Sequence, residues 1–359
     1  MSRRKANVMQ IGDLFIGGDY PIAVQSMLSV PNADVQGNLE QARRLDAAGC
    51  DILRVAVPNQ EAVKLVALLK ETVSMPIVAD IHFDYRLALE SAAAGVDKIR
   101  INPGNIGDDS RVKAVADVCK QKNIPIRIGV NSGSVEKHIL AKHGHPTAAA
   151  LVESALYHAS LLEKFDYNNI ALSMKATDIP SMTEAYELAA ESCDYPLHLG
   201  VTHTGTWRMG LMKSAMGIGS LLLGGIGDTL RVSLTADPVE EIRAGREILR
   251  ISGRSDRGVD IIACPTCGRT EADVFGMTDK VAAALQDCDL PITVAVMGCV
   301  VNGPGEAREA DLGVACGKGA GILFAKGEIL RRVTEEEMLP ALLEQIEIFK
   351  KEAAHAQLL

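Results

Sequence analysis

The sequence predicts an α/β protein whose larger part is a (β/α)8 barrel of the triosephosphate isomerase type. A short apolar strand, a polar turn and an amphipathic helix recur eight times within the first 235 residues. Strands that alternate with helices in this way indicate a parallel sheet, and eight such units are enough to close it into a barrel. A doubly wound open sheet is the alternative fold.

The hydrophobic periodicity places the elements of this barrel. Helical patterns occur between the strands, for example at Val35–Ala48, Gln60–Glu71, Tyr85–Ala94 and Thr147–Lys164. The predicted strands are Ile22–Gln25, Ile52–Val57, Ile77–Asp80, Lys98–Ile101, Ile126–Val130, Asn169–Ser173, Leu197–Gly200 and Thr229–Ser233.

A second, smaller domain is expected after the barrel. The chain has 359 residues, more than one hydrophobic core usually serves. Its composition turns polar and glycine-flanked at Gly253–Gly258, so we expect one domain in residues 1–255 and another in residues 256–359. The second domain has predicted strands at Asp260–Ala263, Thr293–Met297 and Gly321–Ala325, and a closing helix at Glu335–Lys351.

Composition and charge exclude several classes of function. The formal net charge of −9 argues against nucleic-acid binding, which requires a basic face. It leaves room for a small anionic ligand, because arginines can cluster locally on an acidic protein. The longest apolar stretch, Ser214–Gly227, is too short to span a bilayer, and no signal peptide is visible. We therefore expect a cytoplasmic protein that binds no membrane.

Three predicted strands share the pattern Asp-x-apolar-Arg-aliphatic. The pattern begins at Asp51, Asp97 and Asp228 and places arginines at positions 54, 100 and 231. An arginine in a buried parallel strand is costly unless an anion meets it. The pattern therefore suggests a ring of cations around one cavity. Structural ion pairs between these arginines and the repeated aspartates are the alternative.

Polar residues also follow nearly every predicted strand. In a barrel enzyme the site is built at the carboxyl ends of the strands, so these residues are candidates for ligand binding. Besides Gln25 and Ser26 after the first strand, they are Asp80, His82, Asn102, Arg127, Asn131, Lys175 and Ser233.

Four of the eight cysteines suggest a metal site. Cys264 and Cys267 form a Cys-x-x-Cys turn directly after an apolar strand, and Cys299 lies in a second turn rich in glycine and proline. Cys316 as fourth ligand would complete a structural zinc site, whereas Glu306 would complete an iron–sulfur site with one exchangeable oxygen ligand. A redox dithiol is the third possibility. The remaining cysteines, at positions 50, 119, 193 and 288, are expected to be inert thiols.

From about Ile22 to Glu328 the sequence resembles the 4-hydroxy-3-methylbut-2-enyl diphosphate synthase family, which serves the methylerythritol phosphate route to isoprenoids. The resemblance rests on Val24-Gln-Ser-Met27, Val78-Ala-Asp-Ile-His-Phe83, Arg100-Ile-Asn-Pro-Gly-Asn-Ile-Gly107, Arg127-Ile-Gly-Val-Asn131, His198-Leu-Gly-Val-Thr202, Lys213-Ser-Ala, Gly225-Ile-Gly-Asp-Thr-Leu-Arg-Val-Ser-Leu234, Ala263-Cys-Pro-Thr-Cys267 and Gly298-Cys-Val-Val-Asn-Gly-Pro-Gly-Glu306.

The resemblance implies a barrel followed by a ferredoxin-like α+β domain that carries a [4Fe-4S] cluster. The implied ligands are Cys264, Cys267, Cys299 and Glu306, while Cys316 falls where the family commonly has a small residue. The implied partners are reduced flavodoxin or ferredoxin, and a second copy of the chain in a head-to-tail homodimer. In that dimer the cluster of one subunit caps the barrel of the other.

The implied substrate is 2-C-methyl-D-erythritol 2,4-cyclodiphosphate, which two electrons and two protons convert to the open-chain product and water. Its diphosphate would be bound by Arg54, Arg100, Arg127, Lys175 and Arg231.

One motif departs from the family pattern. The family usually reads Thr-Glu-Ala-Gly after the seventh strand, and this chain reads Thr202-His203-Thr204-Gly205. His203 is a candidate proton donor in place of the glutamate, because imidazole titrates near neutral pH; a diverged activity is the other interpretation. Two wider alternatives are a non-catalytic iron or redox sensor, and a barrel enzyme with a structural zinc tail.

Overall fold

The computed structural model describes residues 2–202, 204–270, 272–286, 288–299, 305 and 307–356, with side chains as far as residue 352. The chain forms two compact units, residues 1–255 and residues 256–359.

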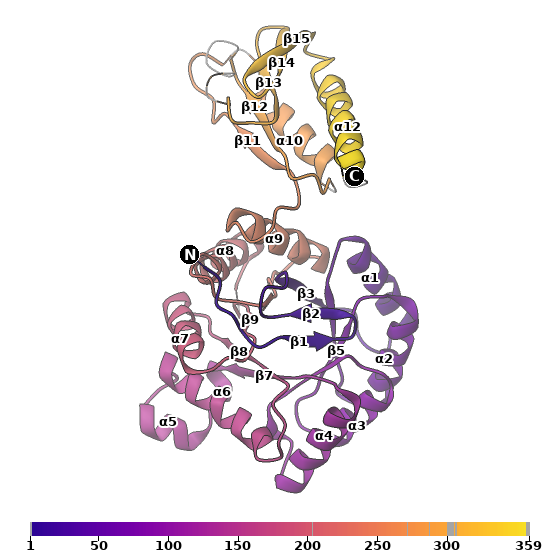
Figure 1. Cartoon of the computed structure of the whole chain (residues 1–359), viewed down its shortest axis with the longest axis vertical. Coiled ribbons are helices and arrows are strands. Elements are labelled where there is room, and N and C mark those ends of the chain that lie inside the picture. Colours follow the sequence, from indigo (N-terminus) through magenta and orange to yellow (C-terminus); the bar gives the residue numbers. More distant parts are fainter. Residues whose placement is uncertain are drawn as a thin grey trace. The chain divides into compact units, whose positions relative to one another are not determined.

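The first unit is a closed barrel of eight parallel strands (Figure 1). Parallel pairing runs from β8 back to β3 and on through β10 to β9, and a bridge between Leu172 and Leu197 joins β8 to β9. The barrel is confirmed, and the open sheet is wrong. Its strands are β3 (Ala23–Met27), β4 (Ile52–Ala56), β5 (Ile77–Asp80), β6 (Lys98–Ile101), β7 (Ile126–Asn131), β8 (Ile170–Lys175), β9 (His198–Leu199) and β10 (Thr229–Leu230).

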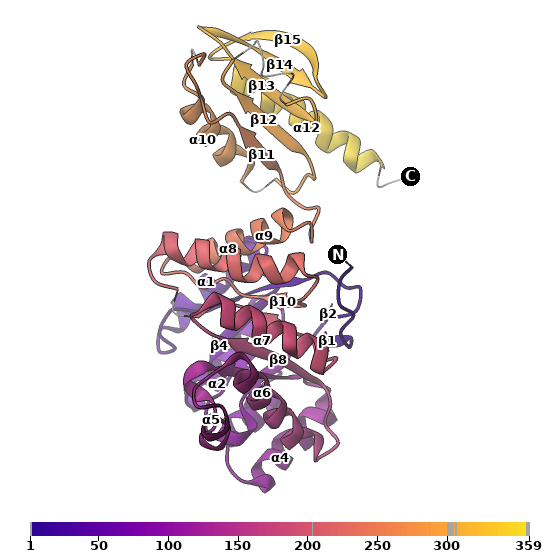
Figure 2. The same cartoon turned by 90° about the vertical axis from the view of Figure 1, so that its left-hand side faces the viewer.

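Helices surround the barrel, and side chains that accept hydrogen bonds from backbone N–H groups begin most of them. Asp34, Asn59 and Asp84 cap the first three in this way. Figure 2 shows α7 and α8 side by side on the outside of the sheet. The helices are α1 (Val35–Ala47), α2 (Gln60–Thr72), α3 (Tyr85–Ala93), α4 (Asp109–Lys122), α5 (Lys137–His143), α6 (Ala148–Glu163), α7 (Ile179–Ser192), α8 (Trp207–Leu223) and α9 (Pro238–Ile251), with short 3-10 helices η1 (Pro103–Asn105) and η2 (Ser132–Ser134).

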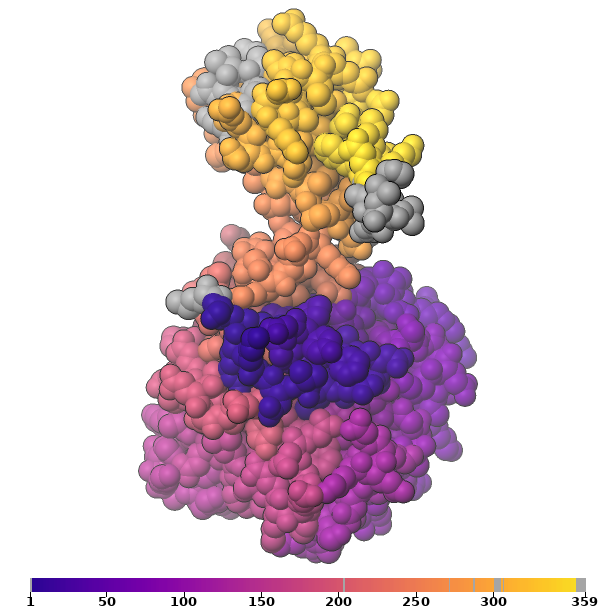
Figure 3. Space-filling view, viewed as in Figure 1, coloured from indigo at the N-terminus to yellow at the C-terminus, as the bar shows by residue number. Residues whose placement is uncertain are grey.

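A hairpin that the sequence did not reveal closes the amino-terminal end of the barrel. β1 (Met9–Ile11) and β2 (Leu14–Ile16) pair antiparallel around Gly12, whose φ of +57° suits the turn. Apolar side chains of the hairpin pack on residues at the starts of the barrel strands, among them Ala23, Ile52 and Val78. Figure 3 shows the N-terminal segment, in indigo, spread over one face of the unit.

The repeated aspartates fasten neighbouring strands together at the same end of the barrel. Each carboxylate lies just before its own strand and accepts a hydrogen bond from a backbone N–H at the start of the neighbouring strand. The three pairs are Asp51 with Val24 (2.7 Å), Asp97 with Ile77 (2.7 Å) and Asp228 with Leu197 (2.8 Å).

These aspartates have cationic partners outside the Asp-x-apolar-Arg pattern. Asp51 pairs with Arg246 (2.7 Å), Asp97 with Lys70 (2.7 Å) and Asp228 with Arg3 (2.9 Å). The alternative in which the repeated aspartates pair with the arginines three positions later is therefore wrong. Those arginines remain available for the interior of the barrel.

The second unit is a mixed five-stranded sheet in the order β11-β12-β13-β14-β15, in which the first three strands are parallel and the last two antiparallel. α10 and α12 share a core with one face, and Ala307 and Ala310 pack on the other. Sequence reasoning missed β13 and β15. The elements are β11 (Asp260–Ala263), α10 (Val274–Leu285), β12 (Thr293–Met297), β13 (Leu312–Cys316), β14 (Ala320–Ala325), β15 (Glu328–Thr334) and α12 (Met338–Ala356).

Candidate active site

The interior of the barrel carries a cluster of basic side chains. Because alternate residues of a strand face the same side, Arg54 on β4, Arg100 on β6 and Arg127 on β7 can all point inward. The strand register sets Arg100 directly beside Arg127 and Asp80 directly beside Arg100. Lys175 ends β8 and Arg231 follows β10, so five predicted cationic residues come from five different strands.

Asp80 is the acidic centre of this cluster. Its Oδ2 lies 2.6 Å from Nη2 of Arg54, and its Oδ1 lies 3.2 Å from Nη1 of Arg100. His82, which is half-exposed, is 3.9 Å away. Burial raises the pKa of Asp80, but the two guanidinium groups outweigh it and lower the pKa to about 2. The carboxylate therefore stays ionised and orients both arginines.

Gly129 on β7 holds Arg100 in place, and Asn102, directly after β6, supports Gly129. Its Nη2 donates to the carbonyl oxygen of Gly129 at 2.8 Å, and the Gly129 N–H donates to Oδ1 of Asn102 at 3.0 Å. A Cβ at Gly129 would lie 2.7 Å from Nε of Arg100, so only glycine leaves room for the side chain. Asn102 thus acts through the backbone of β7, in addition to any contact with a ligand.

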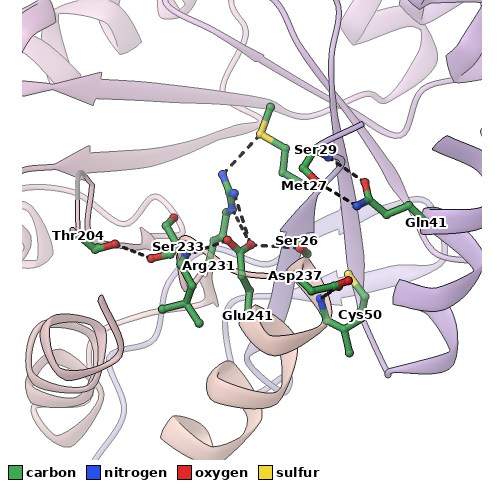
Figure 4. Close-up of polar contacts among 12 residues, drawn as sticks. Ser26, Met27, Ser29, Gln41, Cys50, Thr204, Arg231, Ser233, Asp237 and Glu241 are labelled. Atoms are coloured by element: carbon green, nitrogen blue, oxygen red, sulfur yellow. Dashed lines mark hydrogen bonds and ion pairs between the residues drawn. The ribbon is translucent and has the colours of Figure 1, made fainter. Parts of the chain in front are cut away.

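Arg231 belongs to a second network beside the strand ends (Figure 4). Its Nε and Nη2 each lie 3.4 Å from Oε2 of Glu241, and its Nη1 lies 3.5 Å from Sδ of Met27. Glu241 also accepts from Oγ of Ser26 at 3.3 Å and from the N–H of Leu234 at 3.0 Å. These long contacts to a carboxylate shared with other donors leave the Arg231 guanidinium able to bind an anion.

The remaining predicted residues line the same strand ends. Lys175 is buried, and a Cβ at Gly200 would lie 2.5 Å from its Nζ, so this glycine makes space for the ammonium group. Asn131 caps η2 and thereby shapes the loop after β7. The carbonyl of Ser233 accepts from Oγ1 of Thr204 at 2.7 Å, which ties the loop after β9 to the end of β10.

The balance of charge indicates what this mouth can bind. Five cationic side chains face two carboxylates, Asp80 and Glu241, among the described residues. Burial and then the neighbouring guanidinium groups, Arg231 first, lower the pKa of Lys175 well below its ordinary value. An anion with two or three negative charges would restore the balance, and planar guanidinium groups suit phosphoryl oxygens.

Sequence reasoning missed two interior residues, Lys98 and His198. Both are fully buried, and His198 Nδ1 is hydrogen-bonded at 2.8 Å to Oγ1 of Thr229. The signal for Lys98 was available, because alternation along β6 puts it on the same face as Arg100. The apolar neighbours Ile99 and Ile101 hide this signal, because they make the segment look like an ordinary buried strand.

The cysteines of the second unit lie at the ends of two parallel strands. The Cys264 N–H donates to Val296 at 2.9 Å and so extends β11, while Cys299 comes two residues after β12 ends. Thr270 fastens the turn, with its Oγ1 3.1 Å from the Cys267 nitrogen. Cys316 is buried in the core beneath α10 and α12. This placement suits Cys264, Cys267 and Cys299, and not Cys316, as ligands of a soft metal.

Two predicted site residues, His203 and Glu306, lie outside the described residues. Within the described part of the chain, no three His, Cys, Asp or Glu side chains gather closely enough to hold a metal ion. The metal ligands therefore stay predictions.

Comparison with known proteins identifies the family. The model of the GcpE TIM-barrel domain matches residues 6–246, and that of the GcpE protein C-terminal domain matches residues 260–348. This chain belongs to the GcpE family.

Curated relatives extend over almost the whole chain. A protein of Fusobacterium nucleatum is 54% identical over 96% of this chain and 97% of its own length. A protein of Clostridium perfringens is 52% identical, with 97% and 99% covered, and one of Bacillus cytotoxicus is 49% identical, with 99% and 96% covered. All three are named 4-hydroxy-3-methylbut-2-en-1-yl diphosphate synthase (flavodoxin).

Solved structures share only the fold with this GcpE chain. N-acetylneuraminic acid synthetase from Leptospira borgpetersenii matches with a TM-score of 0.50 and 12% identity, covering 78% of this chain and 98% of that one.

Among the described residues, the structure contains no helix with both the length and the apolar character needed to cross a bilayer.

The depressed pKa of Asp80 predicts a specific pH dependence of stability. A carboxylate whose pKa falls from 3.8 to about 2 on folding stabilises the barrel above pH 4, and this contribution disappears as the pH falls towards 2. We expect Asp80→Asn to lower the free energy of unfolding by about 2 kcal/mol at pH 6. Below pH 4 the difference in this free energy between the parent and the variant should narrow.

Urea unfolding measures this difference for the barrel unit when it is followed by the fluorescence of Trp207, the single tryptophan of the chain. The matched control is Asp117→Asn on α4, whose exposed carboxylate pairs with Lys113 and should contribute under about 1 kcal/mol at any pH. A gap that stayed constant from pH 6 to pH 2.5 would contradict the role assigned to Asp80.

Proposed function

We propose that this chain converts 2-C-methyl-D-erythritol 2,4-cyclodiphosphate to 4-hydroxy-3-methylbut-2-enyl diphosphate, using electrons from reduced flavodoxin. The observation that carries the proposal is the excess of cationic side chains at the barrel mouth. The sequence supports it as well, because the three relatives named 4-hydroxy-3-methylbut-2-en-1-yl diphosphate synthase (flavodoxin) are 49–54% identical to this chain over nearly its full length. Ferredoxin is the alternative one-electron donor.

The barrel mouth would bind the diphosphate and orient the rest of the substrate. Arg54 on β4 and Arg100 on β6, bridged by Asp80 on the strand between them, present guanidinium groups to the mouth. Arg127, Lys175 and Arg231 would meet the phosphoryl oxygens from the other side. Asn131 ends β7, and His82, Asn102 and Ser233 follow β5, β6 and β10 within three residues. These four residues would contact the hydroxyl groups and phosphoryl oxygens. A buried charge surrounded by these donors is fixed more firmly than one in water.

The overall reaction consumes two electrons and two protons. The bond between C2 and its phosphate oxygen breaks, the hydroxyl on C3 leaves as water, and a double bond forms between C2 and C3. The phosphate oxygen that leaves C2 becomes the free end of the diphosphate. Its negative charge grows while the bond breaks, so the arginines that contact it bind the transition state more strongly than the cyclic substrate.

We propose that the second unit carries a [4Fe-4S] cluster on Cys264, Cys267, Cys299 and Glu306. Thiolates at the ends of adjacent parallel strands suit iron, and a carboxylate is the ligand most easily exchanged for a substrate oxygen. When bound, the cluster supplies electrons one at a time. The position of Cys316 in the hydrophobic core speaks against a four-cysteine zinc site.

The ligand set and the activity can be tested together. We expect Cys264→Ala, Cys267→Ala and Cys299→Ala to lose iron and sulfide, and with them turnover of the cyclic diphosphate by reduced flavodoxin, because each removes a thiolate. Cys316→Ala is the matched control and should keep both. Iron lost from Cys316→Ala but retained in Glu306→Ala would refute the ligand assignment, and iron without turnover in the parent would favour a sensor.

We propose His203 as the proton donor that replaces the usual family glutamate. The loop that contains it is held at both sides, by the Thr202 N–H on Ala176 (3.4 Å) and by Thr204 on Ser233 (2.7 Å). A histidine donor requires imidazolium, so turnover should fall as the pH rises through the pKa of His203. This alkaline limb distinguishes it from water as the proton source.

His203→Ala should lose about 10²–10⁴-fold in kcat, the usual contribution of a general acid, while still binding the cyclic diphosphate. His203→Glu restores the usual family residue and should retain activity with an altered pH profile. Parental rates in His203→Ala across the pH range would remove His203 from the mechanism.

We propose a head-to-tail homodimer in which the second unit of one subunit serves the barrel of its partner. Subunit complementation provides the test. Cys264→Ala disables only the cluster and Arg231→Met only the barrel mouth, so each homodimer should be nearly inactive. Coexpressed subunits would form mixed dimers with one intact barrel facing one intact cluster, and activity should return. No recovery in verified mixed dimers would show that each subunit works alone.

A further inference from the structure

A second layer of polar side chains lies inside the barrel beside the predicted substrate ring. It contains Gln25 on β3, Lys98 on β6 and His198 on β9, and it adjoins Arg127 of the ring on β7; all four residues are at most 1% exposed. In the described part of the chain, no hydrogen-bond partner is within reach of the amide of Gln25, Nζ of Lys98, Nε and Nη2 of Arg127, or Nε2 of His198. So many unpaired buried polar atoms in one place are costly and point to a function.

The groups that face Lys98 from the surrounding strands are mostly cationic. Arg127 on β7 and Arg54 on β4 act on it directly, and His198 on β9 faces it in turn. Its partner in the register on β5 is the apolar Val78. Asp80, one position further along the inner face of β5, is already bound to Arg54 and to Arg100.

Lysine and arginine respond differently to such surroundings. Arginine keeps its proton in proteins, so the guanidinium groups around Lys98 stay charged. Lysine can release its proton, and burial followed by repulsion from Arg127 and Arg54 lowers the pKa of Lys98 well below its ordinary value. The pKa of His198 is also lowered well below its ordinary value, by burial and then by Arg127, Lys175, Lys98 and Arg54.

We propose that Lys98 is a proton acceptor linked to anion binding: it is an uncharged amine when the barrel mouth is empty and gains a proton from solvent when an anion binds to the neighbouring arginines. The negative charge of the ligand then offsets the charge of the new ammonium group. The identity of the anion rests on the function proposed above, but the linkage requires only a multivalent anion in the ring.

The linkage fixes the sign of a pH effect. If binding takes up protons, the affinity falls as the pH rises, by about tenfold per pH unit for each proton taken up. Lys175 also faces the ring and its pKa is lowered by the same kind of neighbours, so it can contribute a proton of its own. The contribution of Lys98 is therefore measured as a difference between variants.

Titration calorimetry of the oxidised holoenzyme with the cyclic diphosphate, without reductant, provides the test. The substrate carries one strongly acidic group on each phosphorus and releases no proton near neutral pH, so a dependence of the heat on the ionisation enthalpy of the buffer reports the protein. We expect about one to two protons taken up per anion at pH 8, and about one fewer in Lys98→Met.

Methionine fills the space of the buried aliphatic chain without titrating, and Lys98→Gln is the second variant should methionine impair folding. Lys64→Met, at an exposed position on α2, is the control and should match the parent. Unchanged proton uptake in both Lys98 variants would overturn the inference and leave Lys175 or His198 as the acceptor. Binding without proton uptake, but with competition by chloride, would show instead a charged Lys98 that already binds an anion.

A second titration with sulfate separates this inference from the proposed function. Proton-linked binding of sulfate, with no binding of the cyclic diphosphate, would support the role of Lys98 and contradict the substrate. If the cyclic diphosphate binds but neither anion causes proton uptake, the result would contradict the role of Lys98 and leave the proposed substrate standing.

Discussion

The interior of this barrel depends on one electrostatic constraint: more positive charge is buried than the described protein groups neutralise. Asp80 and Glu241 face Arg54, Arg100, Arg231 and their neighbours. Burying an isolated charge destabilises the fold, and guanidinium groups cannot avoid this by releasing protons. The fold can hold them because Asp80 bridges two of them and because the mouth is where a ligand completes the balance.

The rest of the barrel is organised to support that charge. Apolar residues of the β1–β2 hairpin close the opposite end, and the repeated aspartates join neighbouring strands there. These aspartates are occupied by backbone N–H groups and by Arg3, Lys70 and Arg246, so they do not neutralise the interior. The protein thus keeps its structural ion pairs at one end and its binding cations towards the other.

The sequence predicts this architecture where a pattern is long or repeated. Eight strand–helix units and the Asp-x-apolar-Arg pattern indicated the barrel and its inward arginines. The partners of those arginines were not predictable, because Asp80 on β5 and Glu241 on α9 meet them only in the folded barrel. β1 and β2, with three residues each, are too short for alternation to appear. β15 is mostly exposed, so it lacks the alternation of a half-buried strand.

Lys98 shows why residue type matters as much as position. A methionine there would fill the same volume, and an arginine would remain charged whether or not the mouth is occupied. Lysine has the property that both lack, since its charge can follow the charge of its surroundings. With arginines at the mouth and a lysine beside them, the empty barrel can reduce its internal repulsion while the arginines stay charged. The ligand that restores the lysine's charge is the one that the arginines bind.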